Sequence, residues 1–248
     1  MGKIIAVVSG KGGTGKTSFT ACVSLALANM GYETLALDCD ITLRNLDLAL
    51  GMSDCAAMDF SDVLEERCTL EEAAVRHRKY PKLSLLCAPL APRETSFSPQ
   101  AMSQLAQAIR ERYDYCLIDA PAGLGEGFAL ATGIADNVVV VTTTDPAALR
   151  DAQRTVTELR QFPAGRVHLA VNRVQKKALR ALHTTIDDAM DTAGLPLLGV
   201  IPEDSDLPLA LNRGIPLREI NYFAQRAYEN IAKRMTGARV PLMRCSRW

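Results

Sequence analysis

The stretch Gly10-Lys11-Gly12-Gly13-Thr14-Gly15-Lys16-Thr17 decides the fold of this 248-residue chain. It follows the apolar run Ile4 to Val8, and its spacing, G-x-x-x-x-G-K-T, is that of a phosphate-binding loop between a strand and a helix. Glycines let consecutive backbone N–H groups point at an anion, and the positive end of the following helix adds to that field. The stretch therefore predicts a nucleoside triphosphate site.

Two lysines and a threonine in this loop are candidates for the chemistry. We expect Lys16 to reach the β- and γ-phosphates and the Thr17 hydroxyl to ligate the Mg²⁺ that accompanies ATP. Lys11 is a second cation in the loop, where it would stabilise charge in the transition state, and the residues alone leave open whose phosphate it touches. The other predicted nucleotide-binding residues of this segment are Gly10, Gly12, Gly13, Thr14, Gly15 and Ser18.

The composition is that of an ordinary globular protein, with 48% hydrophobic and 23% charged residues. Lys+Arg and Asp+Glu are equal at 28 each, so net charge gives no reason to expect specific nucleic-acid binding. The seven cysteines contain no C-x-x-C pair, which argues against a disulfide framework. We see no signal peptide and no apolar run long enough to cross a membrane, and we therefore expect a cytoplasmic protein.

Apolar runs alternate with helical patterns along the chain. This order predicts an α/β protein with the three-layer fold of P-loop NTPases: a mostly parallel sheet of about seven strands, flanked by helices on both faces. We expect one domain over residues 1–237 and a basic, apolar tail over 238–248. The other expected strands are 34–37, 83–86, 115–118, 138–141, 166–171 and 197–201, and the expected helices are 18–30, 99–112, 146–161 and 179–193.

Carboxylates follow two of these strands, where a doubly wound sheet presents its ligand site. Asp38 and Asp40 end one strand, and Asp119 ends another in the manner of a Walker B aspartate. We expect Thr17 and Asp119 to serve the metal, while Asp38 and Asp40 are well placed either for Mg²⁺ or for the attacking water. Asn172 also stands at a strand end, where its amide suits the edge of an adenine ring or, alternatively, stabilises a turn.

Several segments together resemble the MinD/ParA family of deviant Walker A ATPases. They are K-G-G-x-G-K-T at Lys11, D-x-D-x-x-L-R-N-L-D-L at Asp38, D-x-P-A-G at Asp119 and G-V-I-P-E-D at Gly199, and the second is closest to the MinD branch. The resemblance implies that Lys11 reaches a partner subunit's nucleotide, that Asp40 positions the attacking water and that Asp38 supports the metal site. It assigns Pro121 and Gly123 to a second switch that senses the γ-phosphate. It assigns adenine binding to Asn172, Arg173, Pro202, Glu203 and Asp204.

The same resemblance implies a slow ATPase that forms a homodimer with ATP and Mg²⁺ and acts in division-site placement with regulators of the MinC and MinE type. Three alternatives stay open. A ParA-like cargo positioner would need a basic surface for DNA. A flagellar-number regulator is the second. The third is a redox carrier like nitrogenase iron protein or a metallocluster-assembly ATPase. Against it, no cysteine occurs soon after Gly123, and the chain has no C-x-x-C or C-x-C pair.

The C-terminal tail is basic and partly apolar. Members of the MinD branch end in an amphipathic helix that lies on a membrane, and the tail residues that would make such a contact are Arg239, Val240, Leu242, Met243, Arg244, Arg247 and Trp248. Pro241 leaves only a short segment for an interfacial helix. Weak contact with an anionic membrane and a solvated chain end are therefore both expected alternatives.

Overall fold

The computed structural model describes the chain except residues 54, 91–97, 182, 215–216, 218–219 and 244–248. The strands in this described part form one sheet in the order β3-β4-β2-β5-β1-β6-β7-β8. All neighbours pair in parallel except β3 and β4, which are antiparallel. The strands are β1 (Lys3–Val8), β2 (Thr34–Asp38), β3 (Val75–Arg76), β4 (Leu83–Leu86), β5 (Tyr115–Asp119), β6 (Asn137–Thr142), β7 (Val167–Val174) and β8 (Leu197–Pro202).

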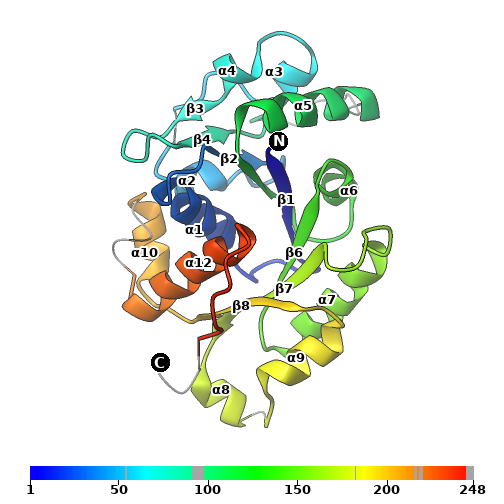
Figure 1. Ribbon diagram of the computed structural model, residues 1–248, viewed down its shortest axis with the longest axis vertical. Helices are drawn as coiled ribbons and strands as arrows, with labels where there is room; N and C mark the ends of the chain where they lie inside the picture. Colours follow the sequence, from blue (N-terminus) through cyan, green and yellow to red (C-terminus); the bar gives the residue numbers. More distant parts are fainter. Residues whose placement is uncertain (54, 91–97, 182, 215–216, 218–219, 244–248) are drawn as a thin grey trace.

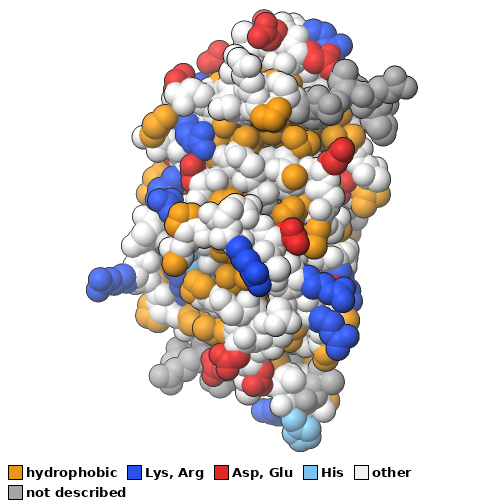
Figure 2. Space-filling model, turned by 90° about the vertical axis from the view of Figure 1, so that its right-hand side faces the viewer, with side chains coloured by type: hydrophobic (Ala, Val, Ile, Leu, Met, Phe, Trp, Pro, Cys, Tyr) orange, Lys and Arg blue, Asp and Glu red, His pale blue; other side chains and the backbone are white. Residues whose placement is uncertain are grey.

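Helices cover both faces of the sheet, which gives the predicted three layers (Figure 1). One face packs against α3 (Phe60–Leu64), α4 (Leu70–Ala73), α5 (Pro99–Arg112), α6 (Glu126–Gly133), α7 (Pro146–Glu158) and α9 (Ile186–Ala193). The other packs against α1 (Lys16–Asn29), α2 (Leu46–Ala49), α10 (Leu207–Asn212) and α12 (Tyr222–Met235). On the side formed by α5, α6 and α7, basic and acidic side chains are interspersed with apolar ones (Figure 2).

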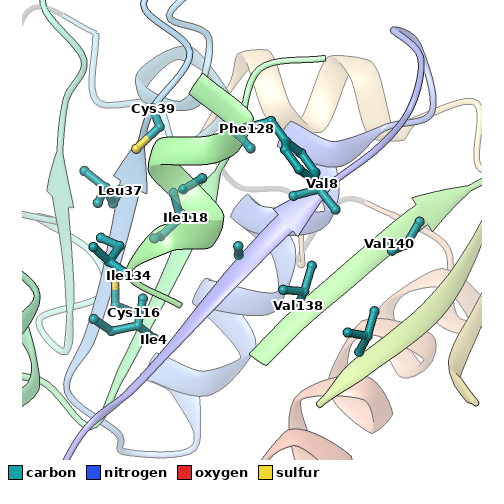
Figure 3. Close-up of a cluster of buried hydrophobic side chains, with 14 of the residues drawn as sticks. Ile4, Val8, Leu37, Cys39, Cys116, Ile118, Phe128, Ile134, Val138 and Val140 are labelled. Atoms are coloured by element: carbon teal, nitrogen blue, oxygen red, sulfur yellow. The ribbon is translucent and has the colours of Figure 1, made fainter. Parts of the chain in front are cut away.

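The central strand β1 shows how the sequence builds two cores. Successive side chains of a strand point to opposite faces. Ile4, Ala6 and Val8 accordingly lie in the cluster beneath α5 and α6, where Ile4 and Val8 lie with Phe128 and Val138 (Figure 3). Ile5 and Val7 lie in the cluster beneath α1 and α12. A strand buried on both faces needs a continuous apolar run, which explains the sequence pattern.

The predicted strands and three of the four predicted helices are confirmed, while the short helices α2, α3, α4, α6 and α10 were not among those predicted. The expected helix 179–193 is wrong, because α8 (Lys176–Ala181) ends and α9 begins anew at Ile186. Thr185 starts α9 with a capping box, in which its hydroxyl accepts from the Asp188 N–H and the Asp188 carboxylate accepts from the Thr185 N–H. The short edge strand β3 was not predicted, since two residues carry no readable periodicity.

Two glycines bring the turn after α2 against the turn after α10. Gly51 and Gly214 have φ angles of 63° and 65°, in the left-handed region. A Cβ placed on Gly51 would lie 2.5 Å from the Cα of Gly214, far inside contact distance. Backbone therefore packs on backbone at this point.

We predict that Gly51→Ala lowers the free energy of unfolding by about 3 kcal/mol, because it combines left-handed strain with overpacking. Gly31→Ala is the matched control, since Gly31 has a φ of 96° and no atom within 4 Å of the added Cβ. That control should cost only about 1 kcal/mol, the strain alone. Urea denaturation measures both, and equal losses would contradict the packing argument.

Candidate functional site

The loop between β1 and α1 has the backbone that its glycines predict. Gly13 and Gly15 have φ angles of 82° and 88°, and α1 begins directly after Gly15 at Lys16. Ser18 lies half-buried in the first turn of this helix. Helix N-termini present unpaired N–H groups and a positive field, so the loop and the first turn of α1 form an anion-binding cradle.

Lys16 is a buried cation at the start of this helix. Its side chain makes no ion pair within the described part of the chain, and the residue is only 9% exposed. Burial lowers the pKa of its ammonium group, and the charges of Asp119 and Asp40 oppose that shift. The Thr14 hydroxyl oxygen in the same loop is also buried without a partner. Both groups fit a phosphate ligand, which would supply the missing negative charge and acceptors.

Asp119 lies beside the first turn of α1, at the end of β5. Its carboxylate accepts hydrogen bonds from the Thr17 hydroxyl at 2.6 Å and from the Thr20 hydroxyl at 3.3 Å. Burial raises the pKa of Asp119 to about 6, although the Thr17 bond and Lys16 favour its charged form. A hydroxyl and a carboxylate this close are oxygen donors of the kind that Mg²⁺ prefers.

The described residues contain no group of three or more His, Cys, Asp or Glu side chains that could hold a metal alone. Mg²⁺ in nucleotide sites usually takes one or two carboxylates from the protein and its other ligands from phosphate and water. Thr17 and Asp119 therefore fit the predicted metal, provided that the nucleotide brings the remaining oxygens.

Asp38 stands next to Asp119 in the β2–β5 register and is 1% exposed. Its two carboxylate oxygens accept from the backbone N–H groups of Asp40 at 2.9 Å and Leu46 at 3.1 Å. Burial and the neighbouring charge of Asp119 raise the pKa of Asp38 to about 7. In this structure Asp38 therefore holds the segment that leads to α2, and its predicted part in the metal site stays a prediction.

Asp40 is half-buried and forms a tight turn with the residues that follow it. Its Oδ1 accepts from the N–H groups of Thr42 and Leu43, and its carbonyl accepts from the N–H of Arg44. The second carboxylate oxygen makes no hydrogen bond within the described residues. The Asp40 carboxylate thus lies close enough to Lys16 to interact with its charge, and its second oxygen is available to accept a hydrogen bond from a ligand or a water molecule.

The predicted second switch follows β5 and touches the segment between β1 and the phosphate loop. Gly123 has a φ of 91°, and its N–H donates to the Ser9 carbonyl at 3.2 Å. The ring of Pro121 packs where a Cβ on Gly127 would be, only 2.3 Å from its Cγ. To sense a γ-phosphate through its N–H, Gly123 would have to exchange Ser9 for the phosphate.

Lys11 is half-exposed and makes an ion pair with a residue outside the loop. Its Nζ is 3.9 Å from Asp145, which caps α7. Gly10 lies so close to α7 that a Cβ there would be 2.4 Å from the carbonyl oxygen of Asp151. The loop and α7 are therefore in direct backbone contact, and the ion pair that Lys11 makes is with the cap of α7 rather than with the site of its own chain.

The residues predicted to hold adenine lie at the ends of β7 and β8. Asn172 and Arg173 contact the carbonyls of Thr14 and Gly13, and Arg173 also pairs with Glu203 at 3.0 Å. These loop contacts were missed in the sequence, because no local pattern signals them. Pro202 is buried at the end of β8. The Asp204 carboxylate accepts from the N–H groups of Asp206 and Asn221, so here it fixes the approach to α12.

Arg234 anchors the start of the C-terminal tail, a role that the sequence did not reveal. Its guanidinium donates to the carbonyls of Leu198, Val240 and Pro241. The tail residues Arg239 and Leu242 are exposed, while Val240 and Met243 are half-buried. The predicted contacts Arg244, Arg247 and Trp248 lie outside the described residues.

Comparison with known proteins finds relatives over nearly the whole chain. A family model described as an AAA domain matches residues 2–169. The septum site-determining protein MinD of Synechocystis is 35% identical over 98% of this chain and 92% of its own. The MinD of the Aquifex aeolicus MinC:MinD complex has a TM-score of 0.89 and 32% identity, covering 98% of both chains. MinD of Pyrococcus horikoshii, solved with Mg-ADP, has a TM-score of 0.82 and 30% identity, covering 95% of this chain and 96% of its own.

We predict that Asp119→Asn raises the free energy of unfolding of the nucleotide-free protein at pH 7.5, on the order of 3 kcal/mol. The pKa of Asp119 is about 6 in the folded state and about 4 in the unfolded state, so between about pH 4 and pH 6 the folded state binds a proton that the unfolded state has lost. Above pH 6 the carboxylate is ionised in both states, and its burial then destabilises the folded protein. The gain should shrink as the pH falls below 6. Denaturation in EDTA measures it. In the control Asp191→Asn, at an exposed position, the free energy of unfolding should not change at any of these pH values. A gain in Asp119→Asn that is independent of pH would contradict this prediction.

Proposed function

Since the chain belongs to the MinD family of septum site-determining proteins, we propose that it is an ATPase that switches between monomer and dimer in division-site placement. Two observations together carry this function: a relationship over 98% of the chain, and a buried Lys16 at the N-terminus of α1 that makes no ion pair with any described residue. A helix N-terminus and a desolvated lysine together form a site for the β- and γ-phosphates.

ATP and Mg²⁺ are the cofactors of this proposal. Lys16 and the N–H groups of the loop would bind the phosphates, and Thr17 with Asp119 would hold the metal, supported by Asp38. When bound, Mg²⁺ neutralises charge that develops on the phosphates. A bound metal would also favour the ionised forms of Asp38 and Asp119, whose pKa values are raised by burial.

Hydrolysis in this proposal depends on Asp40 and Lys11. The free oxygen of Asp40 would orient the attacking water, while the turn held by Thr42 and Leu43 keeps that carboxylate in place. Lys11 is exposed and pairs with the cap of α7 rather than with its own cradle, so it is available to a second subunit's nucleotide. Slow turnover fits this arrangement, because the catalytic set would be complete only in a dimer.

The Aquifex structure is a complex of MinD with MinC, which supports a MinC-type partner for this chain. A MinE-type activator is part of the same proposal. We place the regulators on the exposed side of α7, because this helix touches Gly10 and its cap Asp145 lies beside Lys11. A partner bound there would be adjacent to the phosphate loop.

Peripheral contact with the inner membrane surface in the ATP state is also proposed. Of the described helices, none combines the length and the apolar character needed to cross a bilayer. The basic and apolar tail supports a surface contact instead, since Arg239 and Leu242 are exposed. Two tails in a dimer would strengthen a weak individual affinity, which explains why ATP would control binding.

We predict that Asp40→Ala lowers ATP turnover about 100-fold and leaves a stable dimer in ATP, because the water loses its orienting carboxylate while phosphate binding persists. Size-exclusion chromatography with light scattering and a phosphate-release assay measure the two effects. Lys16→Ala is the matched control that should neither bind ATP nor dimerise. Unchanged turnover in Asp40→Ala would refute the assignment of Asp40.

We further predict that ATP, but not ADP, causes the protein to sediment with anionic vesicles. Removal of residues 239–248 should abolish that sedimentation without changing the dimer seen by light scattering. Vesicles of neutral lipid serve as the control, since the arginines of the tail require anionic headgroups. Equal pelleted fractions with ATP and ADP would argue for the solvated chain end.

A further inference from the structure

The backbone of β7 is irregular at Asn172 and Arg173, beside the phosphate loop. The pairing of β7 with β8 shifts register between Val171 and Val174. Arg173 has a φ of 55°, in the left-handed region, which costs a residue with a side chain about 1 to 2 kcal/mol. Bulges of this kind change where side chains point, and strained residues cluster where function requires them. The irregularity places both side chains against the loop.

Both side chains donate hydrogen bonds to carbonyl oxygens of the loop. Asn172, which is 2% exposed, donates from Nδ2 to the Thr14 carbonyl at 2.9 Å. Arg173 donates from Nη1 to the Gly13 carbonyl at 3.2 Å, while its Nε and Nη2 bond to Glu203. The approach is close, since a Cβ on Gly15 would lie 2.3 Å from the Asn172 Nδ2.

These bonds determine where the N–H groups of the loop point. A trans peptide is planar, so its C=O and N–H point in opposite directions. The described residues contain no cis peptide bond. Because β7 holds the carbonyls of Gly13 and Thr14, the N–H groups of the next residues, Thr14 and Gly15, are directed away from β7. That is the side on which the loop would receive phosphate.

We propose that Asn172 and Arg173 are positioning residues that fix these two peptide groups and so pre-organise the loop for the triphosphate. The hydrogen-bonding capacity of Asn172 supports an action through the loop. Its Oδ1 accepts from the Arg173 N–H and one hydrogen of its Nδ2 goes to Thr14, so half of its hydrogen-bonding capacity is used within the chain, and one Nδ2 hydrogen and one Oδ1 lone pair remain. This inference rests on the proposed function, because it names how that site holds its nucleotide.

The first test separates phosphate binding from base recognition. Asn172→Ala and Arg173→Ala are compared with Lys177→Ala, an exposed lysine on α8, by displacement of a fluorescent ATP analogue. The competitors are ATP, GTP and inorganic tripolyphosphate, each with Mg²⁺. We expect each variant to weaken ATP and tripolyphosphate by the same factor, about tenfold, with the ratio of ATP to GTP affinity unchanged. Unchanged tripolyphosphate affinity with an altered ATP to GTP ratio would overturn the proposal.

The second test needs no ligand. In ¹⁵N relaxation of the nucleotide-free protein, the order parameters of the Thr14 and Gly15 amides should fall in both variants and stay unchanged in Lys177→Ala. Rigid amides in Arg173→Ala would overturn the proposal, and this variant is expected to fold because its side chain is half-exposed. Failure of the unaltered chain to bind ATP would instead refute the proposed function, while the relaxation result would still decide the positioning role.

Discussion

The hydrogen bond from the Thr17 hydroxyl to Asp119 is the interaction on which the rest of the site depends. It joins the first turn of α1 to the buried Asp119 at the end of β5, at 2.6 Å. The cradle, Lys16 and the end of β2 are thereby held around one carboxylate. Since the neighbouring Asp38 is also buried, the adjacent C-terminal ends of β2 and β5 carry two carboxylates whose charged forms burial disfavours and a bound cation would favour.

This arrangement makes the site a compromise between stability and readiness to bind. The buried lysine and the two buried aspartates each lack full compensation within the described residues, and each would gain it from a phosphate or a metal. Ligand binding would therefore stabilise the folded state by supplying partners for these three buried charged groups. The same logic explains why Asp38 and Asp40 organise the segment before α2 through backbone N–H groups.

Much of the fold could be predicted from the sequence, because β1, β5, β6 and α1 have strong apolar patterns and follow recognisable turns. The division between α8 and α9 was missed because the stretch has no Gly or Pro, although the spacing T-x-x-D from Thr185 to Asp188 is a capping-box signal for a new helix. The loop residues and the acids at strand ends were predicted from local motifs. The contacts of Asn172, Arg173 and Arg234 with distant carbonyls were not, because such bonds depend on tertiary approach and on a bulge that no local pattern marks.

The contact between Gly51 and Gly214 has a consequence for how the sequence can vary. Neither position offers a side chain that could shrink or rotate to admit a change in the other. The two sites are therefore not independent targets for mutation, although they are far apart in the chain. A related sequence would either keep both glycines or shift both turns apart. The segment before α3 and the segment before α12 are therefore expected to change together.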